Sequence, residues 1–279
     1  MRCEKNTKCN MTRNTKIILN VVIWSALVVY LVLAAGYCSR QKSDRICTGL
    51  NITVKDSLKV GLLTAESVRG ILVSERMKLT GARLDSISLF AVEEALSSRS
   101  YIKSAQVYTS LDGKLNIEVE QRVPVARVQT ENGYRFFLSE DGVVMPLRSS
   151  SFIDVPIVTG TPEFTFGTDF EGAVPMPENE EKKSLENYRF LQNLINFVEF
   201  LEQDPFWGGQ IVQINVIKGN DTELIPRVGR GVILLGGLED YREKLEKLYT
   251  FYQRGLAYEG WNKYAHINLK YKGQVVCTP

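Results

Sequence analysis

The strongest hydrophobic pattern in the chain is an apolar run near its N-terminus, residues 17–36, in which the polar interruptions are Asn20 and Ser25. A helix rises about 1.5 Å per residue, so this run would extend about 30 Å, the thickness of the hydrocarbon core of a bilayer. The run contains no proline, so a helix here can satisfy its own backbone hydrogen bonds in lipid. The pattern predicts a single transmembrane helix over residues 17–37, with Tyr37 at the membrane interface.

Two other kinds of segment share some features of this run. A cleaved signal peptide would suit the small residues Ala34 and Gly36, but its apolar core is usually only about 7–15 residues long. A lipoprotein signal would use Cys38, but the residue before this cysteine is the bulky Tyr37. We therefore favour an uncleaved anchor.

Basic residues flank the run unevenly. Those before it are Arg2, Lys5, Lys8, Arg13 and Lys16, and those after it are Arg40, Lys42 and Arg45. This bias predicts that the tail, residues 1–16, stays in the cytoplasm and that the bulk of the chain is exported. Residues 38–47 are polar and are interpreted as a short linker.

Alternating and helical patterns follow in the order strand, helix, helix, strand, strand over residues 48–121. Residues 50–55 and 114–120 alternate apolar and polar positions as half-buried strands do. Thr64 is a candidate N-cap for the first helix, and the second helix begins near Ser88. The pair Asp112-Gly113 predicts a hairpin turn of type I′ between the last two strands.

The remaining part, residues 122–279, reads as short strands interrupted by two long helices. Pro124 breaks the preceding pattern, and the helices are expected over residues 184–203 and 239–254. A strand over residues 265–271 and a further apolar piece, Val275 and Val276, close the chain. The whole exported part is therefore predicted to be α+β, with a small β-α-α-β-β domain and a larger, mostly antiparallel β domain with flanking helices.

Composition narrows the function. The chain has 279 residues, a formal net charge of +2, five cysteines and one histidine, His266. The balanced charge gives no indication of nucleic-acid binding, and the sequence contains no Cys-x-x-Cys pair, phosphate-binding glycine loop or serine-nucleophile motif. We expect no enzymatic activity, no cofactor and no metal site.

The order of elements and four local motifs resemble the bacterial cell-division family FtsQ/DivIB, most closely its Bacteroidetes-like branch. The β-α-α-β-β part looks like a POTRA domain. The motifs are residues 115–126 (LNIEVEQRVPVA), 136–146 (FFLSEDGVVMP), 155–160 (VPIVTG) and 265–276 (AHINLKYKGQVV). The sequence departs from the family pattern at Gln121, Ser139 and Asn268, where the family often has acidic residues.

The resemblance implies a bitopic scaffold in the cytoplasmic membrane at the division septum, with the bulk of the chain in the periplasm. Its expected partners are FtsB-like and FtsL-like small bitopic coiled-coil proteins, which add a strand to the C-terminal sheet, and other division proteins that bind the POTRA-like domain. Small-molecule and nucleic-acid partners are not expected. The implied partner-binding residues are Ile267, Leu269, Tyr271, Gly273, Val275 and Val276, with Trp261 and Tyr264 as neighbours.

Other interpretations stay open at this point. The alternation of Ile267, Leu269 and Tyr271, taken alone, favours a face of the core over a binding edge. A membrane-anchored envelope enzyme of the hydrolase class would need a catalytic set that the sequence does not reveal. A POTRA-bearing chaperone or translocation component usually has repeated POTRA modules, and only one is found here.

Overall fold

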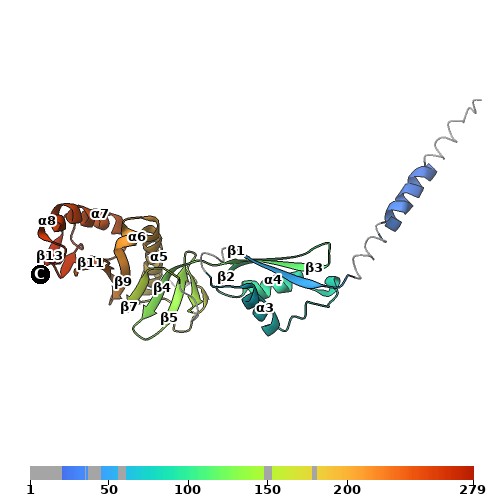
Figure 1. Ribbon diagram of the computed structural model, residues 1–279, viewed down its shortest axis with the longest axis horizontal. Coiled ribbons are helices and arrows are strands. Elements are labelled where there is room, and N and C mark those ends of the chain that lie inside the picture. The colour runs from blue at the N-terminus through green and yellow to red at the C-terminus, as the bar shows by residue number, and fades with distance from the viewer. Residues whose placement is uncertain (1–20, 35, 37–44, 56–60, 148–152, 178–180) are drawn as a thin grey trace, which may run out of the picture. The chain divides into compact units, whose positions relative to one another are not determined.

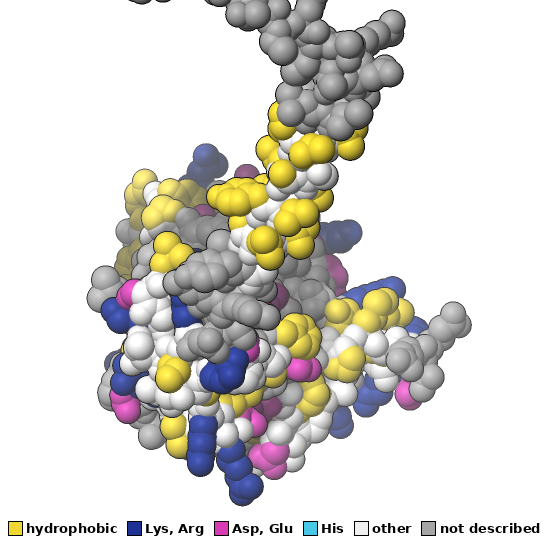
Figure 2. Space-filling model, turned by 90° about the vertical axis from the view of Figure 1, so that its right-hand side faces the viewer, with side chains coloured by type: hydrophobic (Ala, Val, Ile, Leu, Met, Phe, Trp, Pro, Cys, Tyr) yellow, Lys and Arg dark blue, Asp and Glu magenta, His cyan; other side chains and the backbone are white. Residues whose placement is uncertain are grey.

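The computed structural model describes residues 21–34, 36, 45–55, 61–147, 153–177 and 181–279 (Figure 1). Residues 21–34 are helical, and their exposed side chains are largely hydrophobic (Figure 2). Among the described residues, no helix is both long and apolar enough to cross a membrane. The other residues of the predicted span, 17–20, 35 and 37, lie outside the described part, as do the predicted tail 1–16 and residues 38–44 of the predicted linker.

The first sheet has three strands in the order β1-β3-β2, with α3 and α4 on one of its faces (Figure 1). Its elements are β1 (Gly49–Lys55), α3 (Ala65–Ser74), η1 (Leu84–Ser86), α4 (Leu89–Ser97), β2 (Ile102–Thr109) and β3 (Lys114–Gln121). The predicted order of strand, helix, helix, strand, strand is confirmed. Thr64 caps α3 as expected, because its hydroxyl accepts a hydrogen bond from Ser67 N at 3.1 Å.

The turn between β2 and β3 lies where it was predicted but is not of type I′. Gly113 has a φ of +81°, whereas Asp112 is not among the described residues with positive φ. Gly113 N donates to Ser110 O, and Ser110 N donates to Lys114 O. The turn is therefore longer than a two-residue hairpin loop, and glycine supplies its left-handed residue.

The second sheet has ten strands in the order β13-β12-β11-β10-β9-β7-β4-β5-β6-β8. Its strands are β4 (Pro124–Thr130), β5 (Arg135–Ser139), β6 (Val143–Pro146), β7 (Ile157–Gly160), β8 (Gly172–Ala173), β9 (Ile211–Ile217), β10 (Asp221–Pro226), β11 (Val232–Gly236), β12 (His266–Asn268) and β13 (Val276–Thr278). The pairs β4/β7, β7/β9 and β11/β12 are parallel and the others are antiparallel. The prediction of a mostly antiparallel sheet is confirmed.

The helical elements of this part are α5 (Lys182–Gln203), α6 (Trp207–Gln210), α7 (Tyr241–Phe251), the π-helical segment η2 (Tyr252–Leu256) and α8 (Ala257–Glu259). One row of buried side chains crosses the sheet in register. It consists of Ile267, Ile233, Leu224, Ile214, Val158, Val128 and Phe136. The buried faces of α5 and α7 belong to the same core, so this row is the centre of the larger part.

The predicted terminal strand over residues 265–271 is shorter than expected. The chain leaves the sheet after Asn268, whose side-chain Oδ1 accepts a hydrogen bond from Lys270 N at 3.0 Å. Residues 276–278 then return as a separate strand, β13, antiparallel to β12. The alternation of apolar residues thus continues beyond the end of the strand. The strand ends at Asn268 because the asparagine side chain takes a backbone N–H that would otherwise be free for a strand partner.

Candidate partner-binding surface

The residues predicted to bind partners separate into buried and exposed groups. Ile267 and Leu269 are buried, with 4% and 0% of their surface exposed. Tyr271 is 51% exposed, and Val276 and Trp261 are each 39% exposed. Val275 and Tyr264 are partly buried, and Gly273 lies in the turn with a φ of +69°. The structure therefore places Ile267 and Leu269 in the core and leaves the exposed group available for contact.

Strand β12 is not the edge of the sheet, because β13 pairs with it. Val232 N donates to Ala265 O and Leu269 N donates to Leu234 O, both bonds joining the β12 region to β11. The N–H and C=O groups of alternate residues in a strand face the same neighbour. Within β12, Ile267 therefore faces β11, and His266 and Asn268 face β13; at the start of the strand Ala265 bonds to both neighbours, since its O accepts from Val232 N and its N–H donates to Thr278 O.

Strand β13 therefore forms the C-terminal edge of the sheet. His266 and Asn268 are in register with Thr278 and Val276, and Cys277 lies between these two. By the same alternation, Cys277 directs its N–H and C=O away from β12. Among the described residues, no strand pairs with that side of β13. The edge offers unpaired backbone groups to an incoming strand.

A lysine from α7 holds the turn that leads to this edge. Lys247 Nζ donates to Tyr271 O at 2.8 Å and to Leu269 O at 3.4 Å. Ala265 N also donates to Thr278 O at 2.9 Å. The edge is thus fixed before any partner arrives, which lowers the entropy cost of binding. Sequence reasoning missed both Lys247 and Cys277, although Cys277 directly continues the apolar pair at 275 and 276.

The predicted neighbours Trp261 and Tyr264 make aromatic and polar contacts of their own. The ring of Trp261 meets that of Tyr252 edge to face, with centroids 5.0 Å apart. Burial raises the pKa of Tyr252 to about 12, so its phenol is neutral. The Tyr264 hydroxyl donates to the carboxylate of Glu259, which also accepts from Lys263. Because Trp261 packs on Tyr252 and is partly exposed, it resembles the aromatic anchors found in binding surfaces.

One edge of the three-stranded sheet differs from the β13 edge. Val107 of β2 donates its N–H to Glu93 Oε1 of α4 at 2.7 Å. A backbone N–H that bonds to a side chain is not paired with the neighbouring strand β3, so it points to the outer side of β2. The Glu93 carboxylate occupies this outer donor, and a new strand would have to displace it.

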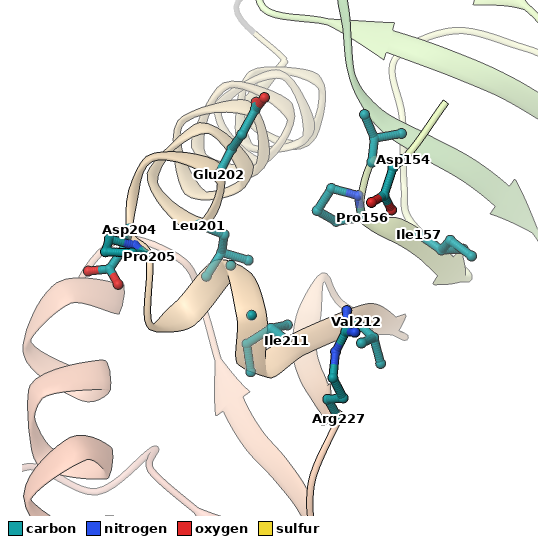
Figure 3. A pocket seen from close by; sticks show the side chains of 13 residues that line it. Asp154, Pro156, Ile157, Leu201, Glu202, Asp204, Pro205, Ile211, Val212 and Arg227 are labelled. Carbon is teal, nitrogen blue, oxygen red and sulfur yellow. The ribbon is translucent and has the colours of Figure 1, made fainter. Parts of the chain in front are cut away.

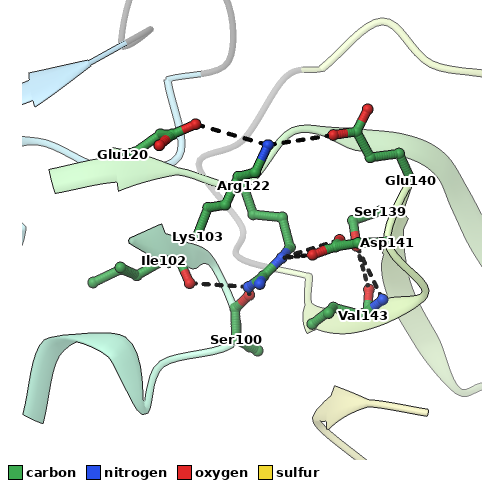
Figure 4. A network of polar contacts seen from close by, with 9 residues as sticks. All are labelled: Ser100, Ile102, Lys103, Glu120, Arg122, Ser139, Glu140, Asp141 and Val143. Atoms are coloured by element: carbon green, nitrogen blue, oxygen red, sulfur yellow. Dashed lines mark hydrogen bonds and ion pairs between the residues drawn. The ribbon is translucent and has the colours of Figure 1, made fainter. Parts of the chain in front are cut away.

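A polar network joins the end of β3 to the second sheet (Figure 4). The Arg122 guanidinium donates to the carbonyl oxygens of Ser100 and Ile102 and to both oxygens of Asp141. Partial burial raises the pKa of Asp141, but hydrogen bonds from Ser139 and Arg122 outweigh this and hold it below its usual 3.8. Arg122 is thus satisfied on both sides of the junction.

Lys103 adds a weaker contact at the same junction. Its Nζ lies 3.7 Å from Glu120 Oε1 and 3.5 Å from Glu140 Oε1. All three side chains are largely exposed, so water screens these pairs and we assign them little stability. Of these two polar links, the one made by Arg122 is the stronger.

A separate hollow of about 440 Å³ lies at the start of β7 (Figure 3). Its labelled lining residues are Asp154, Pro156, Ile157, Leu201, Glu202, Asp204, Pro205, Ile211, Val212 and Arg227. Asp204 Oδ1 accepts hydrogen bonds from Phe206 N and Trp207 N, so this carboxylate holds the backbone at the start of α6. In the part of the chain that the structure describes, no three His, Cys, Asp or Glu side chains lie together as a metal site.

Comparisons with known proteins match two successive segments of the chain. The sequence model described as FtsQ/DivIB, C-terminal related, matches residues 123–278, more than half of the chain. The POTRA-like domain model matches residues 45–120. The cell division protein FtsQ of Rhodothermus marinus is 25% identical over 205 residues, which cover 71% of this chain and 67% of that protein.

Proposed function

Because the chain belongs to the FtsQ/DivIB family, we propose that it is a membrane-anchored scaffold of the bacterial division machinery, which acts by binding proteins rather than by catalysis. The observation that carries this proposal is the C-terminal edge of the ten-stranded sheet. There the backbone of Cys277 is directed outward, and the side chains of Tyr271 and Val276 are exposed nearby. Such an edge can take up a partner strand.

The proposed organisation follows the sequence. Residues 1–16 form a cytoplasmic tail, 17–37 a single membrane span and 38–47 a linker. The POTRA-like domain, 48–121, and the β domain, 122–279, are exported to the periplasm. The apolar run and the helical conformation of residues 21–34 support the span.

The proposed partners are small bitopic division proteins of the FtsB and FtsL type. Main-chain hydrogen bonds to β13 would provide affinity, and the exposed side chains beside it would provide selectivity. Of the predicted residues, Tyr271, Val275 and Val276 act at this surface, with Trp261 and Tyr264 next to it. Ile267 and Leu269 support it from the core. The POTRA-like domain is a second docking surface for other division proteins.

The test is capture of the FtsB-like and FtsL-like proteins by the full chain in detergent, compared with a chain ending at Gly273. This truncation removes β13 but keeps Ile267 and Leu269, which belong to the core. Capture by the full chain alone supports the proposal. No capture by either chain rejects the scaffold function. Stronger capture by the truncated chain would mean that partners pair with β12 and that β13 covers it.

A further inference from the structure

Exposed apolar side chains gather at the tip of the β2–β3 hairpin. Leu111 is 91% exposed, more than any other large hydrophobic residue in the described part of the chain. Ile46 is 54% exposed and Tyr108 is 47% exposed. Residues 45–51 and 108–116 belong to the same compact unit. A single exposed apolar residue is ordinary, but exposed apolar side chains that lie together on one surface mark protein or membrane interaction sites.

Backbone and side-chain contacts tie this tip to the segment that leaves the predicted span. Arg45 Nη1 donates to Leu111 O at 3.2 Å, and Thr48 N donates to Gly113 O at 3.0 Å. A Cβ atom on Gly113 would lie 3.2 Å from Ile46 O, so the two segments are in close contact. Leu111 and Ile46 therefore share one small surface, at the place where the chain enters the POTRA-like part.

The length of chain before Arg45 limits how far this surface can be from the membrane. From Tyr37, the end of the proposed span, the eight peptide steps to Arg45 reach at most about 28 Å. Arg45 is hydrogen-bonded to Leu111 O, so Leu111 lies within a similar distance of the end of the span. Such a short tether gives a weak binding surface a high effective concentration at the bilayer.

The chemistry of the tip suits a lipid surface. An exposed leucine and isoleucine can enter the boundary between headgroups and acyl chains, where a tyrosine and an arginine are also favoured. Asp112, which follows Leu111 in the sequence, is paired with Lys114 at 3.0 Å, so its charge is compensated. We propose that the β2–β3 tip docks on the bilayer that holds the anchor, with Leu111 inserted and Ile46 beside it. This inference rests on the membrane anchor of the proposed function.

The test uses the full chain reconstituted into vesicles of phosphatidylethanolamine and phosphatidylglycerol. A photoreactive benzoylphenylalanine replaces Leu111 in one variant and Tyr258 in a control, since Tyr258 is 86% exposed. After irradiation, we expect about tenfold more phospholipid adduct at position 111 than at position 258. Equal yields at the two positions would overturn the proposal, and so would an adduct at position 111 that contains protein instead of lipid.

A second variant tests whether Leu111 itself holds the tip on the membrane. With the photoreactive residue at Ile46, the substitution Leu111→Asp should lower the lipid adduct several-fold, while Val73→Asp, at a 74% exposed site on α3, should not. Equal adduct in both would contradict the inference.

Alkaline washing of the vesicles separates this inference from the proposed anchor. If the chain is released, the anchor is wrong and the inference falls with it. If the chain is retained but position 111 gives no lipid adduct, only the inference fails.

Discussion

The two sheets treat their edges in opposite ways. Strand β2 has eight residues, yet its outward N–H at Val107 is occupied by the Glu93 carboxylate at 2.7 Å. Strand β13 has three residues, and no described strand or side chain accepts from the outward N–H of Cys277. Strand β2 therefore has an outward donor that a side chain already occupies, whereas the outward donor of β13 is open. A side chain from another element can thus block part of a long edge strand, so strand length alone does not predict which edge binds a partner.

The largest expected effect comes from removing the outward donor of β13. Cys277→Pro deletes an N–H that does not bond to β12, so β13 should stay in place, because proline is tolerated on the free side of an edge strand. We expect the affinity for the FtsB-like and FtsL-like pair to fall about a hundredfold, as measured by biolayer interferometry. Cys277→Ser keeps the N–H and should bind normally.

Val276→Pro distinguishes the two ways in which the edge can work. Its N–H faces Asn268, so proline here should detach β13 from β12. If partners pair with β13, Val276→Pro loses binding as Cys277→Pro does. A gain in affinity would show instead that partners pair with β12 and that β13 covers it. In that case β13 would block an edge, as Glu93 does at β2.

The next effect concerns Arg122, whose guanidinium bonds both to Ile102 O at the start of β2 and to Asp141 between β5 and β6. Arg122→Ala removes hydrogen bonds to Ser100 O, Ile102 O and Asp141 and leaves two carbonyls without this donor. We expect the free energy of unfolding of residues 48–279 in urea to fall by about 2 kcal/mol. Lys114→Ala, which breaks an exposed pair with Asp112, should leave this free energy nearly unchanged, because water screens that pair.

Acid should reduce the stability that the Arg122–Asp141 pair contributes. The pKa of Asp141 lies below its usual 3.8 in the folded chain, so its charged form favours folding above that pH. This stability is lost as the pH falls below 3.8 through the folded value. The difference in unfolding free energy between the wild type and Asp141→Asn should therefore be present at about pH 6 and shrink at about pH 3. A difference that does not depend on pH would mean that the Asp141 charge is irrelevant to the junction.

Sequence patterns predicted the order of the first strands and helices because this order depends on signals within a few residues. The Thr64 cap, the position of the Asp112-Gly113 turn and the alternation of β3 each act within a few residues. They were enough to predict the elements of the first sheet, whereas the family resemblance came from the order of elements and from motifs spread over residues 115–276.

The binding edge could not be predicted in the same way. The closure of β2 depends on Glu93, which meets Val107 from a different element, and the form of the C-terminal turn depends on Lys247 of α7. The residues 265–271 alternate like one strand, but Asn268 bonds to Lys270 N and ends it early. Distant contacts and a competing side chain decided which of the predicted residues are core and which are surface.

A smaller effect is expected from uncovering β2. Glu93→Ala leaves the N–H of Val107 without its acceptor, and we expect a loss of about 1.5 kcal/mol in the stability of the POTRA-like part. Glu94→Ala, at the exposed neighbouring position, is the matched control. The freed edge should also increase self-association in size-exclusion chromatography. Unchanged stability and association would mean that Glu93 does not guard this edge.

The smallest effect tests whether side chains add to the backbone at β13. Tyr271→Ala removes a ring that is 51% exposed, while Lys247 keeps its bond to Tyr271 O, so the turn should hold. We expect the affinity for the FtsB-like and FtsL-like pair to fall about fivefold, and Tyr258→Ala to leave it unchanged. If Tyr271→Ala binds normally while Cys277→Pro does not, main-chain pairing alone accounts for affinity at this edge. Selectivity would then have to come from a surface away from β13, and the side of Trp261 that is 39% exposed is a candidate.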